Sequence, residues 1–529
     1  MQGSKLYRYF WIGIGLLALS LQIFIIYYVY WHRHFLVPPG NDVVGHYNLI
    51  KTVMVAGKVN LSAYPAGFHL IVIGISKLFH RDIWWVLTNL TPILIILPTL
   101  AMFFLLRQIF SLKVSVLTSF VLLLSSGYPL YGFIDGNYPD MLAYGFFAVM
   151  LFAFLIRYFK TNKKLNLVWS GLFLLLIALT HHFTFFNVLS ILLVFGLIQL
   201  YQKIFTCKIK LSLKVVLSTG IFLVLLIAGY FLSELLYGGM VSNFIIGFFT
   251  NAPFLKNNYL NILPDYNDYP SFAGNLVWCF GLAGFIYLLM TNFSTKTDKK
   301  AKQLVIIWLI FFYVMSRLNE SSVPGRFARE LALPLTVSLA FLWRYVFELN
   351  LNRIRLGQIF VFGLIGYLVI INSVIFNGFN EIPNTFTNHI WFWPVDQAKV
   401  DYIDSNIAKD APILYNPAAN LFLPVKTTNI RMTPLKLTEE QILVVENYRK
   451  HQDDKKIQKN YQNLIKDVQL KYKNISYVLD DVNPPGNTDP SAYPAYANYL
   501  NYKKVIESLE EESQNVKTFE DSASIHKIR

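Results

Sequence analysis

Long stretches without a charged side chain constrain this chain more than any other feature. Residues 165–202, for example, hold no Lys, Arg, Asp or Glu over 38 positions. A helix needs about 20 mostly apolar residues to cross a bilayer, and inside a bilayer only helices and closed barrels satisfy every backbone group. The runs therefore predict a mainly α, polytopic membrane domain over residues 1–379 with about eleven transmembrane helices. We place these spans near residues 9–31, 83–106, 114–133, 141–156, 165–180, 183–202, 215–233, 271–292, 303–316, 330–347 and 357–376.

The net charge of +15 is unevenly distributed along the chain. Residues 1–376 hold 28 Lys and Arg against 11 Asp and Glu, whereas residues 377–529 hold 18 against 20. The basic excess belongs to the membrane domain, where it sets orientation, so membrane lipids and no nucleic acid are the expected partners. The two cysteines, Cys207 and Cys279, lie in different environments and do not indicate a disulfide framework.

The loop charges also predict an orientation. Nineteen Lys and Arg fall in one set of loops, and nine of the eleven acidic residues fall in the opposite set. The positive-inside rule then gives a multi-pass protein of the cell (plasma) membrane, with a cytoplasmic N-terminus and acidic extracytoplasmic loops. Counting the apolar run 65–79 as a span would reverse every later loop. We therefore interpret it as an interfacial or half-inserted helix within a long first outer loop.

The first part of that outer loop is predicted to be a second interfacial helix. Pro38, Pro39 and Gly40 impose a turn, after which Asp42 opens a helical segment that ends near Gly57. Its apolar residues recur at helical spacing, as expected for a helix on a membrane surface. Asp42 and His46, four residues apart, share one helix face.

The tail differs in composition from the rest of the chain. Residues 380–529 are rich in Lys, Asp, Glu, Asn and Pro and contain no run of spanning length. They predict a soluble, extracytoplasmic α/β domain with strands at 411–414 and 475–479 and helices at 395–407 and 438–463.

Polar residues gather in the predicted outer loops, and each group has a structural and a functional interpretation. Asp42 and Asp140 could cap helices and turns, or they could act together as a general base or as ligands of Mg²⁺ or Mn²⁺. His46 is a second candidate for catalysis. The arginines near residue 320 oppose the positive-inside rule, which favours an anionic ligand, although they could also pair with nearby acids. The candidate substrate-binding residues are Asp135, His69, His181, His182, Arg317, Glu320, Arg326 and Arg329.

These positions resemble the GT-C superfamily of integral-membrane glycosyltransferases. The resemblance is carried by Asp42 after the first span, by Tyr-Pro-Ala-Gly-Phe at 64–68 opening a helix, and by Asp140 before the fourth span. That superfamily includes oligosaccharyltransferase catalytic subunits, protein O-mannosyltransferases and aminoarabinose transferases. The resemblance implies sugar transfer from a polyprenyl-phosphate donor to a glycan, lipid or protein acceptor of the cell envelope. It implies that Asp42 is the first-loop catalytic carboxylate, that Asp140, with Asp135, is the second-loop acid, and that the arginines contact the donor phosphate.

Other function classes fit parts of the same pattern. A transporter would place ionisable groups near the middle of the bilayer and often shows inverted repeats, and neither feature is present. A non-catalytic scaffold of envelope assembly and a polysaccharide polymerase or ligase both remain as alternatives. The tail has no Trp-Trp-Asp motif, which argues against glycosylation of protein asparagines.

Overall fold

The computed structural model describes most of the chain and divides it into two compact units. One unit comprises Met1–Val29 with His46–Phe379, and the other comprises Tyr30–Gly45 with Asn380–Arg529. The described residues are 2–32, 37–38, 42–56, 65–123, 125, 127–134, 136–206, 263–318, 324–348, 394–417, 426–429, 431–480, 494–510, 513–519 and 523–528.

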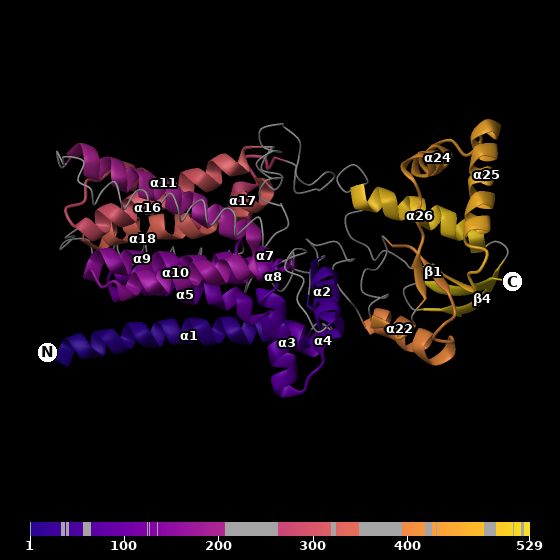
Figure 1. Ribbon diagram of the computed structural model, residues 1–529, viewed down its shortest axis with the longest axis horizontal. Helices are drawn as coiled ribbons and strands as arrows, with labels where there is room; N and C mark the ends of the chain where they lie inside the picture. The colour runs from indigo at the N-terminus through magenta and orange to yellow at the C-terminus, as the bar shows by residue number, and fades with distance from the viewer. Residues whose placement is uncertain are drawn as a thin grey trace, which may run out of the picture. The chain divides into compact units, whose positions relative to one another are not determined.

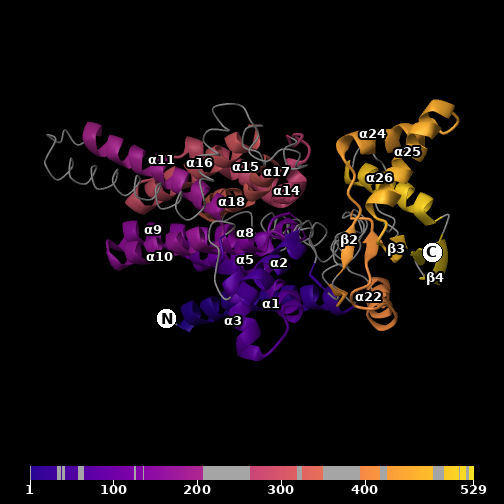
Figure 2. The same cartoon turned by 45° about the vertical axis from the view of Figure 1, so that its right-hand side comes forward.

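The first unit is helical throughout its described part, and its long helices lie side by side (Figures 1 and 2). Its first half contains α1 (Gln2–His32) as far as Val29 and α2 (Asp42–Ala56) from His46 onward. It continues with α3 (Gly67–Phe79), α4 (Ile83–Leu90), α5 (Ile93–Ile109), α6 (Leu112–Leu123), α7 (Leu130–Ile134) and α8 (Tyr138–Asp140). A π-helix (Met141–Ala148) then leads into α9 (Val149–Thr161), α10 (Leu165–Thr180) and α11 (His182–Thr206). The remaining helices are α14 (Tyr269–Ala273), α15 (Asn275–Met290), α16 (Lys296–Ser316), α17 (Pro324–Glu330) and α18 (Ala332–Glu348).

Several of these helices match the expected spans. Within the described residues, Tyr138–Thr161, His182–Gln202 and Pro324–Phe347 are long and apolar enough to cross a membrane. The predicted span 83–106 is instead a pair of helices, α4 and α5, that meet at an angle of 42°. Pro92 lies at the break, where its missing N–H interrupts the helical ladder. The predicted spans 215–233 and 357–376 lie outside the described residues, so the number of spans stays a prediction.

The run 65–79 forms a helix that is short for a span. Helix α3 has 13 residues, or about 20 Å at 1.5 Å per residue, whereas the hydrocarbon core is about 30 Å thick. This length is compatible with the expected interfacial helix, because a helix lying on the bilayer surface needs no particular length.

Small residues allow two of the long helices to pack closely. A Cβ on Gly284 of α15 would lie 2.1 Å from the backbone oxygen of Ser338 in α18, and one on Gly281 would lie 2.7 Å from the Cβ of Leu335. Only glycine permits this approach, which is a common way for helices to associate in membranes.

The two ends of the helical unit differ in charge. One end, called the basic end below, surrounds a pocket lined by Lys113, Lys160, Asp298 and Arg344, and Arg344 pairs with Asp298 at 3.0 Å. The opposite end, called the Asp140 end, carries α7, α8 and α17 (Figure 1). The predicted orientation of the basic and acidic loops across a membrane stays a prediction.

The second unit is an α/β domain. Its strands are β1 (Ile413–Tyr415), β2 (Met432–Pro434), β3 (Tyr477–Asp480), β4 (Ser513–Thr518) and β5 (Ser524–Ile528), and they form one sheet in the order β2-β1-β3-β5-β4. β1 is parallel to β2 and β3, whereas β5 is antiparallel to β3 and β4. Its helices are α22 (Pro394–Asn406), α24 (Glu439–Lys450), α25 (Lys455–Lys471) and α26 (Pro494–Glu510). Val445, Leu464 and Ile506 from three of these helices pack with Leu414 and Val478 of the sheet.

The predicted helix 438–463 is wrong, because the structure has two helices there. Thr438 and Gln441 form a capping box at the start of α24. Asp454 then caps α25 by accepting hydrogen bonds from the backbone N–H groups of Lys456 and Ile457. This second cap starts a new helix inside the segment that looked continuous.

Candidate active site

Asp140 is a deeply buried acidic residue. A second one, Glu330, lies beside it. The side chain of Asp140 is 1% exposed at the end of α8, directly before the π-helix. The hydroxyl of Thr184 donates a 2.6 Å hydrogen bond to its Oδ1, and Nδ1 of His181 lies 3.3 Å from the same oxygen. Oδ2 accepts no hydrogen bond from the part of the chain that the structure describes. A buried carboxylate with one committed and one open oxygen is suited to contact a substrate.

The junction between α10 and α11 positions His181 and Thr184. Helix α10 ends at Thr180, His181 adopts an extended backbone conformation, and α11 starts at His182. This break allows the backbone N–H of Thr184 to donate to Nδ1 of His181 at 3.2 Å, while the two side chains lie 2.7 Å apart. The Thr-His-His sequence therefore brings one of its two histidines to Asp140, and the other follows as the first residue of α11.

Two of the three candidate arginines lie with Asp140. Arg326 and Arg329 are three residues apart on α17, so they share one face of the helix. Arg326 donates a 2.5 Å hydrogen bond to Oδ1 of Asn137, three residues before Asp140. Both guanidinium groups are within electrostatic range of Asp140 and of Glu330, the last residue of α17. The site thus combines two positive and two acidic groups in a buried setting.

Arg317 lies in a different environment. It donates a 2.6 Å hydrogen bond to the backbone oxygen of Pro264, and its guanidinium lies 4.5 Å from the ring centroid of Tyr266. The structure therefore divides the three predicted phosphate-binding arginines into a pair at Asp140 and one that holds the 264–266 segment.

His46 and His69 meet beside the turn that precedes Asp140. Nδ1 of His46 lies 3.1 Å from Nε2 of His69, and both rings pack near Phe68. The ring of His46 also faces Tyr138, with 6.3 Å between the centroids. Burial lowers the pKa of His46 to about 4 and that of His69 to about 3, and the charge of Arg326 adds to the effect on His46. Both histidines are therefore neutral at pH 7.

The other predicted site residues are placed less fully. Asp42 is the first residue of α2 and is exposed, one helical turn before His46. Asp135 and Glu320 lie outside the described residues. The ring of His182 lies 5.5 Å from that of His181.

Sequence reasoning missed three contributors to this site. Thr184 donates a hydrogen bond to Asp140, and Asn137 accepts one from Arg326. Tyr144 holds α17 by donating a 2.8 Å hydrogen bond to the backbone oxygen of Glu330. The indole of Trp308 in turn donates to the Tyr144 hydroxyl at 2.9 Å. The sequence offered one signal for Thr184. It lies three residues after His181, the spacing at which a residue before a helix contacts the first turn of that helix.

No family model and no curated protein match the sequence. Solved structures of an oligosaccharyltransferase from Archaeoglobus fulgidus do match. The apo form has a TM-score of 0.61 at 13% identity, covering 97% of this chain and 74% of that chain. The form in complex with an inhibitory peptide and a dolichol-phosphate has a TM-score of 0.59 at 12% identity, covering 96% and 73%.

This chain has the oligosaccharyltransferase fold. These matches confirm the fold that the resemblance implied. The match extends over almost the whole chain, so it includes both the helical unit and the α/β domain. Both the apolar helices and the fold therefore indicate a membrane protein.

The oligosaccharyltransferase fold also raises the question of a metal. One matching structure is a complex with Zn and sulfate, at a TM-score of 0.58 and 12% identity, covering 96% of this chain and 72% of that chain. Among the residues described here, no group of three or more His, Cys, Asp or Glu could hold a metal ion. Asp140 has one oxygen committed to Thr184 and stands near two guanidinium groups that repel a cation. The oxygen atoms described at this site therefore do not fit the predicted Mg²⁺ or Mn²⁺ site of Asp42 and Asp140.

Proposed function

We propose that this protein is a membrane glycosyltransferase that acts at the Asp140 end of its helical unit. In this proposal a sugar moves from a polyprenyl-phosphate donor to a glycan, lipid or protein acceptor on the outer face of the membrane. The fold supports a glycosyltransferase, and a matching structure in complex with a dolichol-phosphate supports a lipid-phosphate donor. The outer face is the one to which the loop charges assign the acidic residues.

The observation that carries the proposal is the group formed by the buried residues Asp140, Thr184 and Arg329 with the half-buried Arg326. A polyprenyl phosphate cannot leave the bilayer, so its head group must be met at the end of a membrane bundle. Sugar transfer builds negative charge on the departing phosphate, and preorganised cations in a water-poor site stabilise such charge strongly. Arg326 and Arg329 supply these cations, with the planar geometry that suits phosphate.

The carboxylates are proposed to act on the acceptor and on the reacting carbon. The open Oδ2 of Asp140 would face the sugar carbon as positive charge develops there, while Thr184 fixes the orientation of the carboxylate. Asp42 would take the proton of the acceptor, the role that the resemblance assigns to the first-loop acid. His46 and His69, which are neutral, would position the groups around the 136–140 segment without adding charge.

A deletion strain provides the test. Envelope glycans are compared by mass spectrometry between the parent strain, the deletion, and the deletion complemented with wild type, Asp140→Asn or Asp42→Asn. Asp265→Asn is the matched control, because the side chain of Asp265 is exposed and its backbone N–H donates to Asp268 rather than to Asp140 or the α17 arginines. We expect wild type and the control to restore a sugar that Asp140→Asn and Asp42→Asn fail to restore at equal protein levels.

The outcomes separate the parts of the proposal. Full restoration by Asp140→Asn would remove Asp140 from the reaction. Full restoration by Asp42→Asn alone would leave the Asp140 site intact and would remove the first-loop acid. If the deletion loses no glycan at all, the transferase proposal fails and a scaffold becomes the better account.

A further inference from the structure

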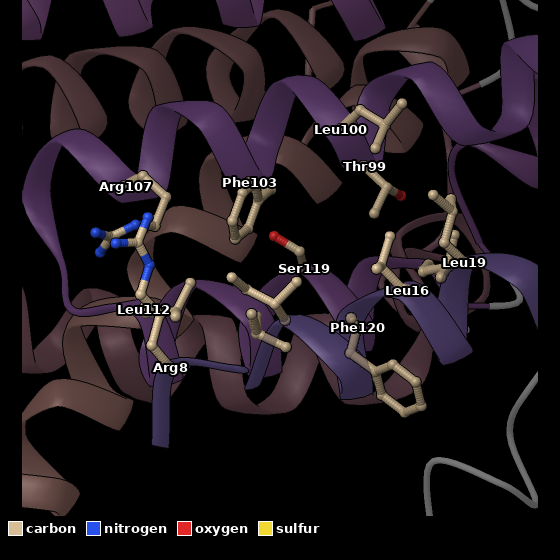
Figure 3. A pocket seen from close by; sticks show the side chains of 14 residues that line it. Arg8, Leu16, Leu19, Thr99, Leu100, Phe103, Arg107, Leu112, Ser119 and Phe120 are labelled. Atoms are coloured by element: carbon tan, nitrogen blue, oxygen red, sulfur yellow. The ribbon is translucent and has the colours of Figure 1, made fainter. Parts of the chain in front are cut away.

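A second cavity of the helical unit lies away from Asp140. It has a volume of about 740 Å³ and is lined by residues of α1, α5 and α6 (Figure 3). Most of its lining is apolar and includes Leu16, Leu19, Leu100, Phe103 and Val116. An apolar groove of this kind on a membrane protein suits a hydrocarbon chain better than a water-soluble ligand.

One end of the cavity is positively charged. The guanidinium groups of Arg8 and Arg107 lie together there, within electrostatic range of each other (Figure 3). Arg107 is held by a 2.6 Å hydrogen bond from its Nη1 to the backbone oxygen of Phe110. No acidic residue lines the cavity, and neither arginine is paired with a carboxylate in the part of the chain that the structure describes. Two adjacent cations without an acid create a site for an anion.

The depth of the cavity corresponds to one leaflet. It extends from Arg107 to Thr99 along α5 and from Leu112 to Leu123 along α6, about 12 and 16 Å at 1.5 Å per residue. Half of a hydrocarbon core of about 30 Å is about 15 Å. Leu16 and Leu100 are 58% and 43% exposed, so the cavity is open at its side. A chain that enters from the surrounding bilayer would thus fill it from the basic end inward.

A polar group lies partway along this wall. Ser119 is buried, lines the cavity, and makes no side-chain hydrogen bond with the described residues. Figure 3 shows its hydroxyl between Phe103 and Thr99. An ester oxygen below a charged head group could accept a hydrogen bond from it.

We infer that this cavity binds an anionic glycerophospholipid, with its phosphate at Arg8 and Arg107 and one acyl chain along the groove. The chain length decides between lipids, because an acyl chain matches one leaflet whereas a polyprenyl chain is much longer. The location also separates this site from the proposed donor site, because Arg107 belongs to the basic end and Asp140 to the opposite one. The inference therefore does not depend on the proposed transferase activity.

Native mass spectrometry of the purified full-length protein tests the inference. Delipidated protein is incubated with phosphatidylglycerol or with phosphatidylcholine of identical acyl chains, and the bound lipid is counted. Wild type is compared with Arg8→Gln/Arg107→Gln and with Gly15→Phe, since the Gly15 position faces Val116 and a phenyl ring would fill the groove. Arg157→Gln is the control, because Arg157 is an exposed arginine near the end of α9 that does not line the cavity.

We expect wild type and Arg157→Gln to retain phosphatidylglycerol over phosphatidylcholine by about 25-fold, from two arginines each worth about a factor of five at a lipid surface. The double variant should lose this preference, and Gly15→Phe should lose both lipids, with unchanged melting temperatures showing that each variant is folded. If the double variant kept the same preference for phosphatidylglycerol over phosphatidylcholine as wild type, the inference would be overturned. Displacement of the lipid by inorganic phosphate alone, or tighter binding of polyprenyl phosphate in the groove, would also overturn it.

Discussion

Thr184 and Asp140 are joined by a 2.6 Å hydrogen bond although 44 positions separate them in the chain. The bond connects the first turn of α11 to the start of the π-helix, and both residues are almost fully buried. A buried carboxylate whose orientation is fixed by a neighbouring helix needs no reorganisation when a substrate arrives. This contact is therefore the most direct place to test whether the Asp140 site is organised for chemistry.

Thr184→Val removes that bond and keeps the shape of the side chain. We expect transfer activity to fall by about tenfold to a hundredfold, because a hydrogen bond to a charged group is worth about 1.5–3 kcal/mol. Initial rates in membranes at matched protein levels provide the measurement. Thr336→Val is the control, since the Thr336 hydroxyl is also buried but bonds only to the backbone oxygen of Ala332. Equal losses in the two variants would show that the effect is structural.

The arginines offer a second test, of substrate binding. Arg326→Gln should raise KM for the lipid donor by about tenfold or more, because a contact between the half-buried Arg326 and a phosphate is charge-assisted. Arg317→Gln should change KM by less than about threefold, because Arg317 is bound to Pro264 and Tyr266 instead. Donor titrations of both variants supply the comparison. A larger effect at Arg317 would place the donor phosphate at the end of α16 rather than at α17.

The histidine pair predicts a dependence of stability on pH. Burial lowers the pKa of His46 and His69 below the usual value of 6.5, so the unfolded chain binds protons more readily than the folded one. Stability should then be fully present above about pH 6.5 and should fall as the pH decreases toward about 4, by roughly 3 kcal/mol for His46.

Melting temperatures in detergent between pH 7.5 and 5 measure this effect. The variant His46→Leu/His69→Leu should show a flatter profile than wild type, and the control His80→Gln, at an exposed position, should follow wild type. Identical slopes for wild type and the double variant would mean that other groups cause the loss of stability.

A fourth prediction concerns the contact of residues 125, 127 and 128 with residues 272–274. Gly274 has a φ of +87°, and a Cβ there would lie 1.8 Å from Oγ of Ser125. Gly274→Ala should therefore cost about 1–3 kcal/mol or more and lower both yield and melting temperature. Gly171→Ala, in the middle of α10 with no atom within 4 Å of the added Cβ, should be neutral or slightly stabilising. A normal melting temperature for Gly274→Ala would show that this segment can shift.

The amino-acid sequence alone determined the class of the protein and the outline of its parts. Charge-free runs and the distribution of Lys and Arg are properties of local composition, and they indicated a helical membrane unit followed by an α/β domain, with acids and bases at opposite ends. The strands near 411–414 and 475–479 were found because short apolar runs with turn signals are local as well. The break between α24 and α25 was missed because a cap at Asp454 competes with helix continuation over only a few residues.

Only the tertiary structure decided which polar residues act together. Asp140 with Thr184, Arg326 with Asn137 and His46 with His69 are pairs separated by 44, 189 and 23 positions. Hydrogen bonds between distant segments depend on how helices pack and where each helix ends, and no local pattern records that geometry. For the same reason three arginines that looked equivalent in the sequence divide into a pair beside Asp140, Arg326 and Arg329, and a third that binds the 264–266 segment.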